Sequence, residues 1–160
     1  MDTDTRTFTL LGASLSMLGL LREQRGIYIT SKTRHAERWR SLRSDGVPII
    51  STWIDEAGVG EVLDWRDLWR RCISEIASSS TLIVYIEPGD VLKGTLVEVG
   101  AALANNVPVL VVGDPVEQGS WWQAEGVRVV RNWTELISMA EVNCNEEGIL
   151  LSDIISFPGT

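Results

Sequence analysis

Two apolar runs, separated by a loop and an apolar helix, most constrain the fold of this 160-residue chain. Residues 81–86 read Thr-Leu-Ile-Val-Tyr-Ile and residues 107–113 read Val-Pro-Val-Leu-Val-Val-Gly, so both predict buried strands. Between them, residues 95–104 predict a helix with a single charged side chain, Glu98. Strand, helix and strand in this order predict a βαβ unit, in which ligands bind where strand ends meet helix starts. Glu98 is therefore expected near a ligand site.

Similar patterns on either side extend this unit into a larger sheet. Further strands are predicted at 26–30, 47–50 and 127–130, and further helices at 34–44, 64–77 and 133–140. This alternation predicts an α/β fold: a small doubly wound, Rossmann-like or flavodoxin-like domain with a mainly parallel five-stranded sheet and helices on both faces. We assign this domain to residues 26–142, an N-terminal helical extension to residues 1–25 and a C-terminal tail to residues 143–160.

Composition excludes several classes of function. The net charge is −8, whereas binding a nucleic-acid polymer rests on Lys and Arg that neutralise phosphates, so no such partner is expected. One histidine and two cysteines, Cys72 and Cys144, supply neither a disulfide framework nor a zinc site, and no metal or other cofactor is expected. There is no run long enough to cross a bilayer and no basic secretory signal at Met1–Asp4, so we expect a cytoplasmic protein without a membrane partner.

The apolar residues of segment 10–21 predict a short amphipathic helix. An isolated helix of this length is marginal in water. Its apolar stripe therefore needs a cover, and we expect a homo-oligomer, since small closed assemblies are common.

Polar residues gather where the predicted strands end. No Gly-x-Gly-x-x-Gly motif or P-loop follows the first strand, which argues against a classical dinucleotide site. Hydroxyl groups and helix-start amides in these positions suit a sugar or a phosphate. Crowded carboxylates at the same edge raise one another's pKa and allow acid–base roles. The expected substrate-binding residues are Thr30, Ser31, Trp53, Asp55, Asp64, Gly94 and Thr95.

Glu98 has two interpretations from its spacing alone. Thr95-Leu96-Val97-Glu98 matches a capping box, in which Thr95 is the N-cap and the Glu98 carboxylate bonds back to the N-cap amide. A carboxylate in the first turn would also suit the helix dipole. The second interpretation is a catalytic carboxylate, because the polar residues of the strand ends are expected beside it.

The seven tryptophans and the single histidine have separate expectations. Trp65 and Trp69, four residues apart on a predicted helix, are expected to pack inward. Trp53 follows a predicted strand and is expected either to stack on a base or to pack as a lid. His35 is expected to be a surface or helix-start residue rather than a catalytic group.

Three segments together resemble the nucleoside 2-deoxyribosyltransferase superfamily, which includes deoxynucleotide N-glycosidases. They are the strand Ile27-Tyr28-Ile29-Thr30-Ser31, the helix pattern Gly94-x-x-x-Glu98-x-Gly100-x-Ala102, and Val107-Pro108-Val109. The resemblance covers roughly residues 26–113. It implies that Glu98 is the nucleophile that attacks the anomeric carbon, and that the Tyr28 hydroxyl orients it, unless strand alternation turns Tyr28 into the core.

The sequence departs from the family pattern at the second acid. Leu92 stands where family members commonly have an aspartate, two residues before the loop glycine. Asp90 flanks that position and is the candidate second catalytic residue. The helix aspartate that helps to protonate the base in the family has no clean match, although Asp64 or Asp67 serves if the alignment shifts.

The resemblance implies cleavage or transfer at the N-glycosidic bond of a nucleoside or nucleotide, a small-molecule partner. Two alternatives stay open. One is a non-catalytic module that binds a nucleotide or nucleoside derivative, with Glu98 only capping its helix. The other is an oligomeric scaffold that uses segment 10–21 and the tryptophan-containing loop near Trp121.

Overall fold

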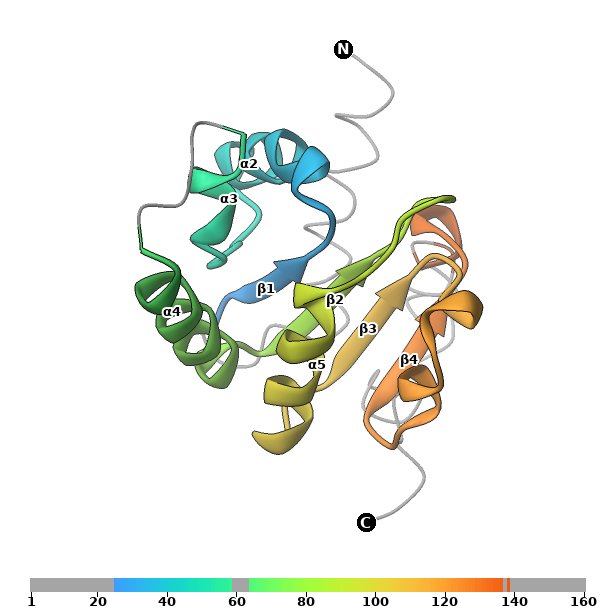
Figure 1. The fold of residues 1–160 in the computed structure, drawn as a ribbon. Coiled ribbons are helices and arrows are strands. Elements are labelled where there is room, and N and C mark those ends of the chain that lie inside the picture. The colour runs from blue at the N-terminus through green and yellow to red at the C-terminus, as the bar shows by residue number, and fades with distance from the viewer. Residues whose placement is uncertain (1–24, 59–63, 137, 139–160) are drawn as a thin grey trace, which may run out of the picture.

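The computed structural model describes residues 25–58, 64–136 and 138 (Figure 1). The predicted helix at 10–21 and the tail at 143–160 lie outside the described residues. None of the described helices is both long and apolar enough to span a membrane.

Four parallel strands form one sheet, and their order in the sheet follows their order in the chain (Figure 1). Thr30 lies opposite Val84, and Val84 lies opposite Val111, so the carboxyl ends of neighbouring strands share one edge. The first three strands are buried along their whole length, as their continuous apolar runs predict for a parallel sheet. The strands are β1 (Ile27–Thr30), β2 (Thr81–Tyr85), β3 (Val109–Val112) and β4 (Val127–Val130).

The strand predicted at 47–50 is reduced to a single parallel bridge between Ile27 and Ile49. Ile27 N donates to Pro48 O at 2.9 Å, and Ile50 N donates to Ile27 O at 3.0 Å. The ladder stops there because the next backbone groups of β1 are taken by side chains: the Ile29 amide donates to Ser51 Oγ, and Ile29 O accepts from the Trp53 indole. Pro48 also has no amide hydrogen to donate. The described residues therefore form an α/β fold with a four-stranded parallel sheet.

Helices fill most of the connections between strands. Two of them, α4 and α5, pack against each other (Figure 1). The element α3 was not predicted, since residues 51–63 carry no helical periodicity. Residues 133–136 are also helical, where the last helix was predicted. The described elements are η1 (Thr33–His35), α2 (Ala36–Ser44), α3 (Trp53–Glu56), α4 (Trp65–Ser78), α5 (Gly94–Ala104), η2 (Val116–Gln118) and η3 (Trp121–Gln123).

Helix α4 has a clear start and a buried stripe. The Asp64 side chain caps it by accepting hydrogen bonds from the amides of Arg66 and Asp67. Leu68, Cys72 and Ile76 are buried at helical spacing. The prediction that Trp65 packs inward is wrong: its exposed fraction is 63%, because it lies in the first turn, before the buried stripe begins.

Candidate functional site

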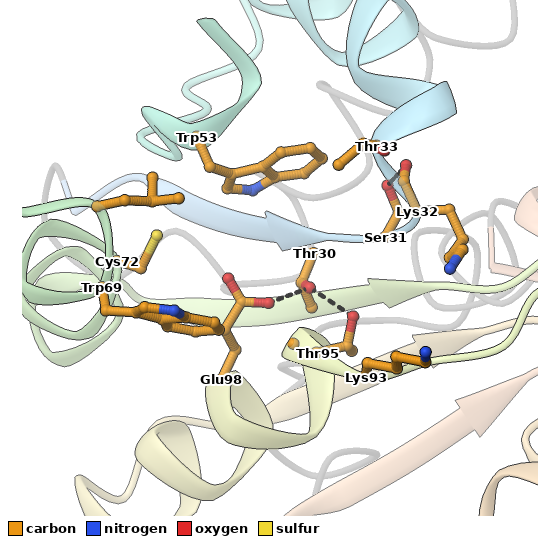
Figure 2. A pocket seen from close by; sticks show the side chains of 12 residues that line it. Thr30, Ser31, Lys32, Thr33, Trp53, Trp69, Cys72, Lys93, Thr95 and Glu98 are labelled. Atoms are coloured by element: carbon orange, nitrogen blue, oxygen red, sulfur yellow. Dashed lines mark hydrogen bonds between the residues drawn. The ribbon is translucent and has the colours of Figure 1, made fainter. Parts of the chain in front are cut away.

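A pocket of about 190 Å³ lies at the carboxyl end of β1, and α3, α4 and α5 supply its other walls (Figure 2). Its position agrees with the general location of ligand sites in open α/β sheets. The lining residues are Thr30, Ser31, Lys32, Thr33, Trp53, Leu68, Trp69, Cys72, Lys93, Gly94, Thr95 and Glu98.

The Glu98 carboxylate lies at the centre of this lining. Its Oε1 accepts a hydrogen bond of 2.6 Å from the Tyr28 hydroxyl, and its Oε2 accepts one from Thr30 Oγ1 (Figure 2). The exposed fraction of Glu98 is 7%, so the residue is buried while its carboxylate faces the pocket. Tyr28 is fully buried and turns its hydroxyl to Glu98, which places both residues in one group.

The capping-box interpretation of Glu98 is wrong. Helix α5 begins at Gly94, its N-cap is Lys93, and no side chain caps that end. Because the helix begins before Thr95, Glu98 falls in the second turn and no acid lies in the first. The carboxylate thus turns to the hydroxyls of β1 instead of to a helix-start amide.

A directed chain of hydroxyl groups leads to the carboxylate. Thr30 Oγ1 and Thr95 Oγ1 lie 2.9 Å apart. Thr30 has one hydroxyl proton, which an ionised Glu98 carboxylate engages, so Thr95 must donate to Thr30. Hydrogen bonds in such a chain polarise one another, and Thr95 therefore supports the negative charge of Glu98 through Thr30.

Burial sets the electrostatics of the group. Burial raises the pKa of Glu98 above its ordinary value, and the hydrogen bonds from Thr30 and Tyr28 offset only part of that rise. Among the described residues, none of the ion pairs includes Glu98. Burial, and then the negative charge of Glu98, raises the pKa of Tyr28, so this hydroxyl stays protonated as a donor. Burial also raises the pKa of the Cys72 thiol to about 11, which keeps it neutral.

Two indole rings border the space in front of Glu98. Trp53 is fixed by its own Nε1, which donates to Ile29 O at 2.7 Å. Trp69 lies over the start of α5, where a Cβ added at Gly94 would come within 3.2 Å of its ring. Figure 2 shows the Trp53 ring on one side of the carboxylate and the Trp69 ring beside it. Aromatic faces in this arrangement suit a flat, aromatic ligand.

Two lysines line the end of the pocket away from Trp69 and Cys72 (Figure 2). Lys32 follows β1, and its Nζ donates to Val91 O at 2.9 Å. Lys93 is the N-cap residue of α5. Sequence reasoning missed both, although they are direct neighbours of the predicted residues Ser31 and Gly94. Their charges make this end of the pocket suitable for an anion.

Not all of the predicted site residues meet at the pocket. The structure brings Thr30, Ser31, Trp53, Gly94, Thr95 and Glu98 to its lining, and Tyr28 to Glu98. Asp55 instead forms an exposed ion pair with Arg43, and Asp64 caps α4. Sequence reasoning also missed Thr33, which follows β1, and Leu68, Trp69 and Cys72 of α4. The three α4 residues were missed because an inward helix stripe gives no sign of whether it packs on the sheet or borders a pocket.

Asp90 is buried in a separate group of charges. Its carboxylate lies 2.9 Å from Arg34 and 3.2 Å from His35 Nε2, and it accepts a hydrogen bond of 2.9 Å from the Glu87 amide. Burial alone would raise the pKa of Asp90, but the Glu87 amide, His35 and Arg34 together lower it. Of the two expectations for His35, the helix start is confirmed, since His35 is the N-cap of α2, whereas the surface position is wrong because the residue is buried. We call Arg34, His35, Glu87 and Asp90 the Asp90 cluster.

Comparisons with protein-family models, curated proteins and solved structures give no match to this chain. The described residues also contain no group of three or more His, Cys, Asp or Glu side chains able to hold a metal ion. Arguments about function therefore rest on the chemistry of the pocket itself.

Proposed function

We propose that this protein cleaves or exchanges the N-glycosidic bond of a nucleoside or nucleotide, with Glu98 as the nucleophile. One observation carries the proposal: a buried carboxylate, held by two hydroxyl groups and lacking an ion-pair partner among the described residues, lies between aromatic side chains at the end of a parallel strand. The proposal includes the doubly wound arrangement of the superfamily that the sequence resembles, with segment 47–50 as a fifth strand beside β1.

The proposed reaction has two steps at one carbon atom. A Glu98 oxygen attacks the anomeric carbon, the carbon–nitrogen bond breaks, and its electron pair leaves with the base, which takes up a proton. The product is a glycosyl ester of Glu98. Water or a second base then attacks the same carbon, the ester bond breaks, the carboxylate is regenerated, and the attacking group loses a proton.

The rest of the pocket fits the parts of such a substrate. The base would lie against Trp53 and Trp69, where its flat faces gain stacking energy. A 5′-phosphate would lie near Lys32 and Lys93, which neutralise its charge. Thr30 and Tyr28 hold the carboxylate in place while the ester forms and breaks. A nucleoside 5′-phosphate therefore uses more of the lining than a free nucleoside does.

The test incubates the protein with a panel of ribo- and deoxyribo-nucleosides and their 5′-monophosphates. Chromatography then measures the free base released. We expect Glu98→Gln to lower base release by about 10³-fold or more, because an amide cannot form the ester. The matched control is Glu37→Gln, which makes the same change at an exposed position of α2 and should release base at the wild-type rate. Equal rates in wild type and Glu98→Gln would refute the proposed nucleophile.

A second candidate, a binding module without turnover, is supported by one specific observation. Glu98 is the single carboxyl group among the described residues that line the pocket, whereas glycosidic cleavage uses a second acid. In that case calorimetry would detect binding of a nucleotide to the wild-type protein, and no member of the panel would lose its base.

A further inference from the structure

The two aromatic walls of the pocket belong to helices that differ greatly in length and in stability. Trp69 lies in α4, which has 14 residues and a capped start. Trp53 opens α3, which has only four residues. A single helical turn is not stable by itself in water. Contacts from outside α3 therefore fix its position, and with it one wall of the pocket. Arg40 of α2 donates to Ile54 O and Ala57 O, the Trp53 indole donates to Ile29 O, and α4 supplies a further set.

Arg71 of α4 supplies the first of these contacts. Its Nη2 donates to the Glu56 carboxylate in α3, and its Nη1 donates to Thr52 Oγ1, at the N-cap of α3. Its Nε donates to Asp67 Oδ2 at 2.8 Å, one turn back along α4. One planar guanidinium group thus joins both ends of α3 to α4.

Glu75, one turn further along α4, supplies the second contact. Its Oε2 accepts a hydrogen bond of 3.0 Å from the Thr52 amide, and its Oε1 accepts one from the Thr52 hydroxyl. The Thr52 hydroxyl accepts from Arg71 and donates to Glu75, so both of its roles are used. We call Thr52, Glu56, Arg71 and Glu75 the α3 brace.

We propose that Arg71 is a positioning residue that, together with the indole bond to Ile29 O, holds Trp53 opposite Trp69 and so affects how tightly the pocket holds a flat ligand. The ligand's identity rests on the proposed function, whereas the placement of α3 does not. Arg71 acts from outside the pocket lining, through the brace, and its effect falls on binding rather than on the Glu98 chemistry.

The geometry of the brace requires an arginine. The Arg71 side chain is 26% exposed, so water screens its contacts less than those of its neighbour Arg70, which is 70% exposed and pairs with Asp67 alone. A lysine at position 71 would keep the charge, but its compact ammonium group lacks the planar fork that spans three acceptors. Arg70 offers a matched control one residue away on the same helix.

The first experiment measures the placement of α3 directly, by hydrogen exchange with mass spectrometry on the full chain. We expect Arg71→Met to speed exchange of peptides covering residues 52–58 by about tenfold or more, because local opening becomes easier when stabilising contacts are lost. Peptides covering α4 should change little, which shows that the domain stays folded. Arg70→Met should match wild type throughout. Unchanged exchange at 52–58 in Arg71→Met would overturn the brace.

The second experiment measures its consequence with deoxynucleoside 5′-monophosphates as the probe. We expect KM for base release to rise about tenfold in Arg71→Met, equivalent to about 1.4 kcal/mol of binding, with kcat within about twofold of wild type. Arg71→Lys should resemble Arg71→Met, and a wild-type KM in that variant would show that charge alone suffices and refute the three-way bridge. Faster exchange with an unchanged KM would refute the link to affinity. Absence of base release from the wild type would contradict the proposed function while the exchange result still decides the placement of α3.

Discussion

Glu98 and Asp90 are eight positions apart in the chain, both follow β2, and both are buried, with exposed fractions of 7% and 5%. Their partners differ in charge. Hydroxyl groups hold Glu98, whereas Arg34, His35 and a backbone amide hold Asp90. The pKa of Glu98 is accordingly raised by burial, and the pKa of Asp90 is lowered because its partners outweigh burial. Burial therefore raises the pKa of a carboxyl group only where no cation or donor outweighs it, and such a raised pKa is one mark of a candidate functional carboxylate.

The two carboxylates also have different structural surroundings. Glu98 faces a pocket, while the Asp90 cluster ties the segment after β1 to the loop after β2. Lys32 adds a third tie by donating to Val91 O. The cluster thus holds together two segments that border the pocket, whereas Glu98 lines the pocket itself. Under the proposed function, Glu98 would carry the chemistry and the Asp90 cluster would support the fold around it.

The strongest challenge to this division is Asp90→Asn. We expect the free energy of unfolding to fall by about 2 kcal/mol, since hydrogen bonds to a charged group are lost and Arg34 loses a buried carboxylate partner. Base release should stay within about tenfold of wild type at temperatures where the variant is folded. Urea unfolding measures the first effect, with Asp45→Asn, an exposed position at the end of α2, as the control.

The opposite outcome would give Asp90 the catalytic role predicted for it from sequence, where it flanks the position of the family aspartate, Leu92. It would consist of wild-type stability together with a loss of base release comparable to that of Glu98→Gln. The Asp90 cluster would then be part of the active site rather than its support.

Tyr28→Phe sharpens the comparison from the side of Glu98. The variant removes a hydrogen bond that lowers the pKa of Glu98, so that pKa should rise further above its ordinary value. Base release needs the ionised carboxylate, and its acidic limb should therefore move to higher pH, with kcat near neutral pH lower by about five- to tenfold. A pH profile of kcat for wild type and variant measures both effects. An unmoved acidic limb would show that another group controls the ionisation.

The raised pKa of Glu98 in the wild-type protein also makes stability depend on pH. Because the folded-state pKa of Glu98 lies above the unfolded value, the folded protein binds more protons between the two values. Stability from this residue is therefore greatest below the unfolded pKa and falls as pH rises through the folded pKa. Glu98→Gln has no such titration, so its unfolding free energy should lack this decline, and urea unfolding across the pH range tests the sign.

The strength of local patterns explains which elements the sequence predicts. The predicted helices at 64–77 and 95–104 agree within one residue with α4 and α5, because an apolar stripe in one and a largely apolar run, with Glu98 as its one charged residue, in the other leave few alternatives. Helix α3 escapes prediction because contacts from α2 and α4, rather than a local pattern, hold its four residues: Arg40 donates to Ile54 O and Arg71 donates to the Glu56 carboxylate. At segment 47–50 the apolar pattern predicts a strand, but only one bridge forms, because the side chains of Ser51 and Trp53 bond to the Ile29 backbone groups that would extend it.

From sequence, the site residues can be predicted only where the order and direction of strands and helices fix their place at the edge of the sheet. Thr30, Thr95 and Glu98 meet because a strand end and a helix start share one edge of the sheet. Which arginine forms an ion pair with each carboxylate depends on the directions of the side chains in the folded structure. That is why Asp55 and Asp90 were grouped with Glu98 from sequence, while the structure gives them arginine partners outside the pocket.

Asp55→Asn should have the smallest effect. Asp55 is an exposed carboxylate and so complements the comparison of the buried carboxylates Glu98 and Asp90. Asp55 and Arg43 form a pair whose side chains are 47% and 35% exposed. Water therefore screens the attraction, and the folded protein loses little free energy when the pair is removed. We expect a change below about 1 kcal/mol in the free energy of unfolding, shrinking further in high salt. Base release should equal that of wild type, since Asp55 does not line the pocket. Urea unfolding at low and high salt and a base-release assay measure the two quantities. A loss of base release in a stable Asp55→Asn protein would mean that the substrate extends beyond the pocket to this carboxylate, and that an exposed, arginine-paired acid at this edge of the sheet takes part in function after all.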